Sequence, residues 1–231
     1  MAVERRWGAG REPRPSVYSV ADGAMRPRWR GRLHLVGFIL AIAATPALLL
    51  AADSLQASIG LVVYAASLML LFGTSASYHL LARTERAQRI MRRLDHSMIF
   101  VLIAGTYTPV CLLALPSAWG LPILFAIWTA AASGVAIKLL AGDWLMRASN
   151  LLYLLLGWIA LGALPVILKH LTRGEFALLA TGGVLYTVGA ILFALRRPRL
   201  LPAIFGYHEV WHGFTVLAAV AHFGMVWSVA G

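Results

Sequence analysis

Seven long apolar blocks, separated by short polar breaks, make up most of this 231-residue chain. A helix that crosses a lipid bilayer needs about 20 predominantly apolar residues. Only 13% of the residues are charged, about half the fraction that is usual in soluble domains. The sequence therefore predicts an all-α membrane protein, a seven-transmembrane helix bundle. The expected spans are Leu33–Ala52, Ile59–Leu81, Leu94–Leu115, Trp119–Leu140, Asn150–Leu168, Phe176–Leu195 and Ala203–Val229.

The distribution of Lys and Arg among the breaks predicts the orientation of the bundle. Cytoplasmic loops of membrane proteins carry an excess of these two residues. If successive spans alternate in direction, 18 of the 20 Lys and Arg residues fall on the side of the N-terminus. We therefore expect a cytoplasmic N-terminus and a C-terminus outside. Because the basic residues lie between apolar blocks, the net charge of +11 does not indicate a nucleic-acid partner.

The polar arm before the first span, residues 1–32, is rich in Arg and has scattered Pro and Gly without periodicity. This composition is typical of a disordered tail, and the predicted orientation places it in the cytoplasm. The apolar run that follows is longer than the hydrophobic region of a signal peptide, so we interpret it as a span. Residues 33–231 then form one transmembrane domain, whose oligomeric state the sequence does not indicate.

Two histidines four residues apart, His208 and His212, open the last apolar block. Their spacing places both imidazoles on one face of a helix. In the predicted orientation, His79 lies at the cytoplasmic end of the second span. Asp95 and His96 lie at the same depth, in the expected first turn of the third span. Ionisable residues inside a membrane are costly, which makes all five candidates for a functional site.

The matched depth of His79, His208 and His212 predicts a three-histidine metal site with water as the fourth ligand. Such an open position is typical of catalytic zinc, and neutral imidazoles suit zinc, although they also bind other transition metals. Ser75, one helical turn from His79, could hydrogen-bond the metal-bound water or a developing oxyanion. Asp95 could orient this water or accept its proton. The alternative for each histidine is a hydrogen-bonded packing role.

The segment from His208 to His212 also matches the H-E-x-x-H pattern of zinc proteases, in which the glutamate is the general base. An intramembrane metalloprotease with Glu209 as its base is therefore a rival interpretation. No well-placed acidic third ligand accompanies the motif outside these five residues. His79 is the better-placed partner for the two histidines.

Three further histidines are less plausible ligands of the metal ion. His96 points about 100° away from Asp95 around its helix, so we expect it to surround the site or to contact lipid headgroups. His222 lies about 15 Å beyond His212 along the helix axis, too far to share the ion, and a packing role is favoured over one in lining the cavity. His34, at the entrance of the first span, is expected at the membrane interface.

Three motifs occur in a fixed order along the chain. They are Ser75-Ala76-Ser77-Tyr78-His79, then Leu94-Asp95-His96 leading into Ala104-Gly105-Thr106-Tyr107-Thr108-Pro109, then His208-Glu209-Val210-Trp211-His212 with Ala221-His222-Phe223. In these motifs the chain resembles the hemolysin III branch of the progestin and adipoQ receptor (PAQR) family. The resemblance spans the second to the seventh helix. It implies a seven-helix bundle in a bacterial inner membrane, with zinc near the cytoplasmic leaflet.

By matching motifs, the resemblance implies zinc ligands at His79, His208 and His212, with Ser75 and Asp95 as polar partners around the zinc-bound water. The family is grouped with alkaline ceramidases as membrane hydrolases, and its adiponectin-receptor members are linked to ceramide hydrolysis. The chain departs from many relatives at Leu80, where they carry Ser. Receptor members lack a glutamate at the position of Glu209, so the resemblance assigns this residue no catalytic role.

We therefore expect a zinc-dependent hydrolase of a membrane lipid amide or ester, similar to a ceramidase. An alternative from another class is a non-enzymatic receptor or membrane regulator, or a pore-forming hemolysin, in which zinc is structural. The intramembrane metalloprotease is the third hypothesis. Replacement of Asp95 by Asn separates the first two, because only chemistry at Asp95 requires its carboxylate.

Overall fold

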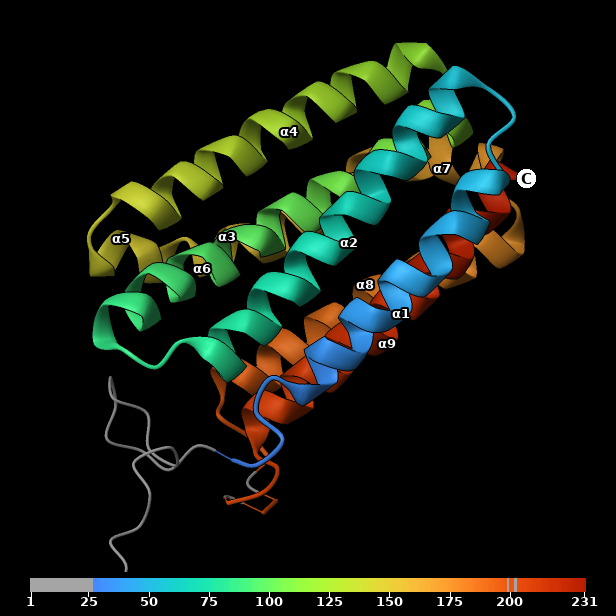
Figure 1. Ribbon diagram of the computed structural model, residues 1–231. Helices are drawn as coiled ribbons and strands as arrows, with labels where there is room; N and C mark the ends of the chain where they lie inside the picture. Colours follow the sequence, from blue (N-terminus) through green and yellow to red (C-terminus); the bar gives the residue numbers. More distant parts are fainter. Residues whose placement is uncertain (1–26, 199, 202) are drawn as a thin grey trace, which may run out of the picture.

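The fold is a bundle of seven membrane-length helical spans, seen in a computed structural model that describes residues 27–198, 200–201 and 203–231. Neighbouring spans along the chain run in opposite directions (Figure 1). The first four spans are α1 (Arg32–Leu50), α2 (Leu55–Leu81), α3 (Glu85–Pro109) with a π-helical turn at Val110–Ala114, and α4 (Ser117–Leu140). The last two are α8 (Arg173–Ala194) and α9 (Tyr207–Ala230). The predicted all-α bundle is confirmed.

The fifth span is broken into several short helices instead of the single helix that we predicted over Asn150–Leu168. It consists of α5 (Asp143–Ala148), α6 (Asn150–Gly157), a 3-10 segment (Ile159–Ala163) and α7 (Leu164–His170). Pro165 lies at the start of α7, where its missing N–H and fixed φ are tolerated but would interrupt a continuous helix. Tyr107 compensates the break: its hydroxyl donates to the Gly157 carbonyl (2.9 Å) and accepts from the Ala160 amide (3.1 Å).

Helix α3 begins nine residues before the predicted Leu94, and this corrects the position of Asp95. Thr84 caps the helix, its hydroxyl accepting from the Ala87 amide at 3.2 Å. The Arg-rich segment that we had taken for a break, residues 85–93, consists mostly of good helix formers. Asp95 therefore lies in the third turn of α3 and not in the first.

Helix α2 lies against α1 and α3 and supplies the centre of the apolar core (Figure 1). Its Leu61, Tyr64 and Leu68 are buried in one apolar cluster with Met225 and Val226 of α9. The outer faces of the peripheral helices instead expose large apolar side chains. This arrangement is the one expected of a bundle that is surrounded by hydrocarbon.

A buried lysine joins α4 to the helices that follow it. The Lys138 ammonium donates to the Met146 carbonyl (2.6 Å) and to Oδ1 of Asn150 (2.7 Å). It also lies 4.9 Å from the centre of the Tyr153 ring. These contacts hold the α4–α5–α6 corner at the end of the bundle where α2 ends and α9 begins.

The predicted tail, residues 1–32, lies mostly outside the described residues. Its last part is described and contacts the bundle. The amides of Arg28 and Trp29 donate to the carbonyls of Ala203 and Ile204, both at 3.1 Å. Residues 27–31 therefore lie along the loop that leads into α9.

Candidate metal centre

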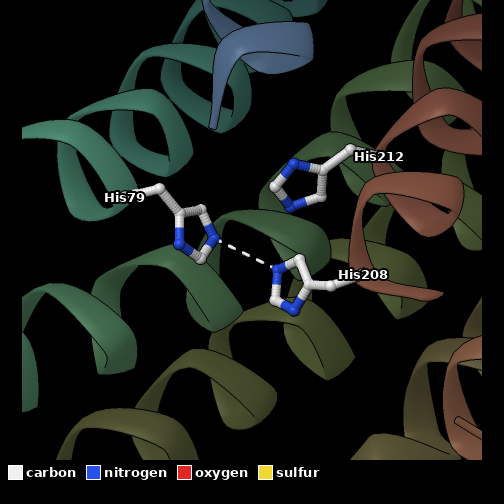
Figure 2. A group of neighbouring side chains, drawn as sticks. All are labelled: His79, His208 and His212. Carbon is white, nitrogen blue, oxygen red and sulfur yellow. Dashed lines mark hydrogen bonds between the residues drawn. The ribbon is translucent and has the colours of Figure 1, made fainter. Parts of the chain in front are cut away.

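Three histidine side chains from two helices converge at one end of the bundle. His79 comes from the last turn of α2, and His208 and His212 come from the first two turns of α9. Figure 2 shows their three rings around a common point, with Nε2 of His79 and Nε2 of His208 3.2 Å apart. One ligand atom from each residue lies within 4.8 Å of the other two. The predicted convergence of these histidines is confirmed.

The geometry fits a bound transition-metal ion. A tetrahedral ion with metal–nitrogen distances of about 2.0–2.1 Å separates its ligand nitrogens by about 3.3 Å. The His79–His208 pair already has this separation, and the third ring needs to approach by a rotation about its side-chain bonds. Three neutral imidazoles form a donor set that zinc, copper, iron and nickel accept. The residues therefore suit a metal, without selecting one metal.

Ser75 and Asp95 lie beside this group, as the sequence analysis placed them. Both line one cavity together with His208 and His212. Ser75 is buried, and its hydroxyl has no hydrogen-bond partner among the described residues that satisfies normal geometry. It nevertheless lies close enough to the Asp95 carboxyl for an interaction between the two side chains. The cavity thus brings together an unsatisfied hydroxyl, a carboxyl group and two of the candidate ligands.

The cavity extends from the histidines far into the bundle, between α3, the broken fifth span, α8 and α9. Its volume is about 490 Å³, within the range of about 300–1,000 Å³ that is usual for ligand sites. Phe193 and Phe176 of α8 both line it, and 17 residues of helix span about 25 Å. Most of its lining side chains are apolar. The histidine group therefore opens onto a long apolar channel.

Of the four histidines outside the group, two lie as expected, one does not, and the fourth, His170, for which the sequence analysis made no prediction, is exposed at the end of α7. His96 lines the same cavity, in agreement with a place around the site. The ring of His222 fills the space over Gly182, and its Nε2 donates to the Leu179 carbonyl at 3.2 Å, as expected for a packing role. His34, predicted at the membrane interface, is instead buried and stacks on His212 with ring centres 3.7 Å apart.

Glu209 is fully buried, and both of its carboxylate oxygens have partners. Oε2 accepts from the Gly206 amide at 2.8 Å, which caps the start of α9. Oε1 accepts from Nε of Arg30 in a partly buried ion pair. A carboxylate that is used in this way is poorly placed to act as the base of a protease. The sequence analysis did not single out Arg30, because nothing local distinguishes it from the other arginines of the arm.

Comparison with known proteins finds a family model and two Bacillus relatives whose names agree with its description. The family model described as "Haemolysin-III related" matches residues 23–223. Hemolysin-3 of Bacillus cereus is 36% identical over 79% of this chain and 82% of its own length. The Hemolysin-3 homolog of Bacillus subtilis (strain 168) is 30% identical over 82% and 87%. The human monocyte to macrophage differentiation factor is 25% identical over 71% of this chain and 68% of its own length.

Proposed function

The chain belongs to the hemolysin III branch of the progestin and adipoQ receptor family, and on this premise we propose that it is a zinc-dependent hydrolase of a membrane lipid amide or ester. His79, His208 and His212 would hold the ion. The observation that carries the proposal is the shared cavity, in which two of these histidines, Ser75 and Asp95 meet a long apolar channel. A hydrolase for lipids needs both parts, a polar reacting end and an apolar site for the chain.

Zinc in a three-histidine site would supply a Lewis acid and an activated water molecule. The Asp95 carboxylate is the group of this chain that can orient the water and take up its proton. Ser75, whose hydroxyl has no other hydrogen bond among the described residues, can donate to the oxygen of the substrate carbonyl as negative charge develops on it. The two residues thus have complementary roles, one accepting a proton and the other donating a hydrogen bond.

The apolar channel would hold the hydrocarbon chain of the substrate. Its length of about 25 Å along α8 approaches the thickness of the hydrocarbon core, about 30 Å. The predicted orientation places the histidines at the cytoplasmic leaflet, where the carbonyl groups of lipids lie. A lipid amide or ester could therefore present its carbonyl to the histidines while its chain stays in an apolar environment. This orientation also supports a location in the inner membrane.

Metal content and lipid turnover test the proposal together. We expect close to one zinc per chain in the purified wild type and clearly less in His79→Ala and His212→Ala. Equal metal in all three proteins would exclude the site. A panel of lipid amides and esters should show turnover by the wild type alone. Bound metal without turnover of any lipid class would leave a non-enzymatic role.

The second candidate function is a non-enzymatic receptor or membrane regulator, or a pore, in which the metal joins α2 to α9. The name of the Bacillus cereus relative, Hemolysin-3, favours the pore within this group. Asp95→Asn should keep the fold and the metal under both proposals and abolish activity only in the hydrolase. Ion conductance through liposomes that contain the wild type tests the pore directly.

A further inference from the structure

The segment that precedes α1, together with the first turn of α1, contacts two of the three histidines and the residue next to the third. We call residues 27–34 the N-terminal clamp. Its first contact is with the His79 ligand. Gly31 has a left-handed backbone (φ 81°), and a Cβ atom at this position would lie 2.6 Å from Cβ of His79. The backbone of the clamp therefore packs directly against the residue that α2 contributes to the group.

The second contact is between His34 and the His212 ligand. The two rings are stacked, 3.7 Å apart and inclined by 14°. His34 is 3% exposed, and neither of its ring nitrogens has a hydrogen-bond partner among the described residues. Because the two rings are nearly parallel, the lone pairs of His34 do not converge with those of His212 on one ion. Its role toward His212 is to support the face of the ring.

The third contact holds the start of α9, where the His208 ligand lies. Arg30 donates to Oε1 of Glu209, the residue directly after His208, while Oε2 of Glu209 accepts from the Gly206 amide. The Glu209 side chain is 0% exposed and the Arg30 side chain is 22% exposed. One partly buried charge pair thus joins the clamp to the first turn of α9.

We propose that the N-terminal clamp positions the metal ligands, and that Arg30 and Glu209 form the ion pair that closes it. Two of the candidate ligands, His79 and His208, lie in the terminal turns of their helices, where helices fray most easily, and His212 lies one turn further along α9. Partners outside the ligand set usually orient metal-binding histidines, and their loss weakens metal binding. Gly31 packs against His79, His34 packs against His212, and the ion pair holds the residue next to His208. The clamp rests on the metal centre proposed above but does not require hydrolysis.

The clamp can act over a long distance in the sequence because the buried Glu209 carboxylate needs the positive charge of Arg30. A buried carboxylate without its cation is strongly unfavourable, because desolvation is no longer compensated. Removal of Arg30 should therefore loosen the first turn of α9 instead of leaving it in place. His208 would then lose its fixed distance from His79, although both ligands remain in the chain.

Cobalt binding by the full-length protein in detergent tests this directly. The variants are Arg30→Gln and Glu209→Gln, and the matched control is Arg89→Gln. Arg89 loses the same charge, but it belongs to an exposed pair with Glu85. We expect Co²⁺ to bind about tenfold or more weakly in the two clamp variants, with altered visible absorption of the bound ion. The control should keep both the affinity and the spectrum of the wild type.

Two conservative variants separate positioning from general stability. Arg30→Lys keeps the positive charge and should restore most of the affinity and the wild-type absorption. His34→Phe keeps an aromatic face against His212 and should bind Co²⁺ like the wild type, whereas His34→Ala should bind it more weakly. A purely structural role would lower the unfolding temperature of Arg30→Gln and leave its cobalt spectrum unchanged.

The outcomes distinguish the clamp from the metal centre. If the wild type binds no metal, both proposals fail together. If the wild type binds metal and Arg30→Gln and Glu209→Gln match it within twofold and in spectrum, the clamp alone is excluded. If Arg89→Gln loses as much affinity as the clamp variants, the effect comes from net charge and the clamp is likewise excluded.

Discussion

Two glutamates, one at each end of the bundle, cap helices in the same way but are used differently. Glu175 is the third residue of α8 and accepts from the Thr172 amide at 2.7 Å. Glu209 is the third residue of α9 and accepts from the Gly206 amide at 2.8 Å. The second oxygen of each reaches a distant helix or segment. For Glu175 the partner is the neutral hydroxyl of Ser228 (2.9 Å), and for Glu209 it is the guanidinium of Arg30.

The difference shows what the metal end of the bundle requires. At the Glu175 end, Thr172 returns a hydrogen bond to the helix, so a complete capping box holds α8 locally. At the Glu209 end, Gly206 has no side chain to return such a bond. The start of α9 therefore depends on a partner from the other end of the chain. At the helix that carries two candidate ligands, a charged connection to Arg30 takes the place of the missing half of the capping box.

The largest effect is expected for Glu209→Ala. The substitution leaves Arg30 partly buried without its partner and uncaps α9, which should cost about 3–5 kcal/mol of the free energy of unfolding. Unfolding of the metal-free protein by SDS titration in mixed micelles measures this. A loss below about 1 kcal/mol would mean that the two glutamates are equivalent caps.

Gly31→Ala should have the next largest effect, and the effect should be a loss of metal affinity. A left-handed backbone costs an alanine about 1–2 kcal/mol, and its methyl group would displace His79. Metal affinity, measured by competition with a chelator, should fall several-fold. Gly174→Ala is the control, because the added methyl group meets only the Thr172 hydroxyl at 4.0 Å. An equal loss of affinity in both variants would contradict the contact with His79.

The smallest effect is expected for Glu175→Ala. It removes the bonds to Thr172 and Ser228, which should lower the free energy of unfolding by about 1–2 kcal/mol. Because this end of the bundle is remote from the histidines, the metal content of the purified variant should equal that of the wild type. Elemental analysis of the variant measures this. A clear loss of metal would contradict the view that only the Glu209 end of the bundle supports the metal site.

The sequence predicted those parts of the molecule that have a local signal. Apolar blocks revealed the spans, and the i, i+4 spacing placed His208 and His212 on one helix face. The count of Lys and Arg supplied the common depth that brought His79 to them, and the structure confirms this group. Helix spacing and matched depth also suggested roles for Ser75 and Asp95, which the resemblance to a family implies as well, and these roles remain predictions.

Contacts between distant helices had no such signal. His34 was predicted at the membrane interface from its position at the start of the first span. Nothing in the sequence indicated that it would stack on His212. Arg30 was one of many arginines in a polar arm, and only the fold shows that it reaches Glu209. The early start of α3 was missed for another reason, since charge marks a break in apolar periodicity but does not prevent a helix.

The pair of Arg30 and Glu209 also imposes an order on biosynthesis. The two residues are 179 positions apart, so Arg30 leaves the ribosome long before its partner is made. Until α9 has been inserted, His79 lacks both of the histidines with which it groups, and the segment around Arg30 has no carboxylate to close on. The site is thus completed by one of the last steps of membrane insertion, and a nascent chain has no three-histidine group with which to capture metal ions.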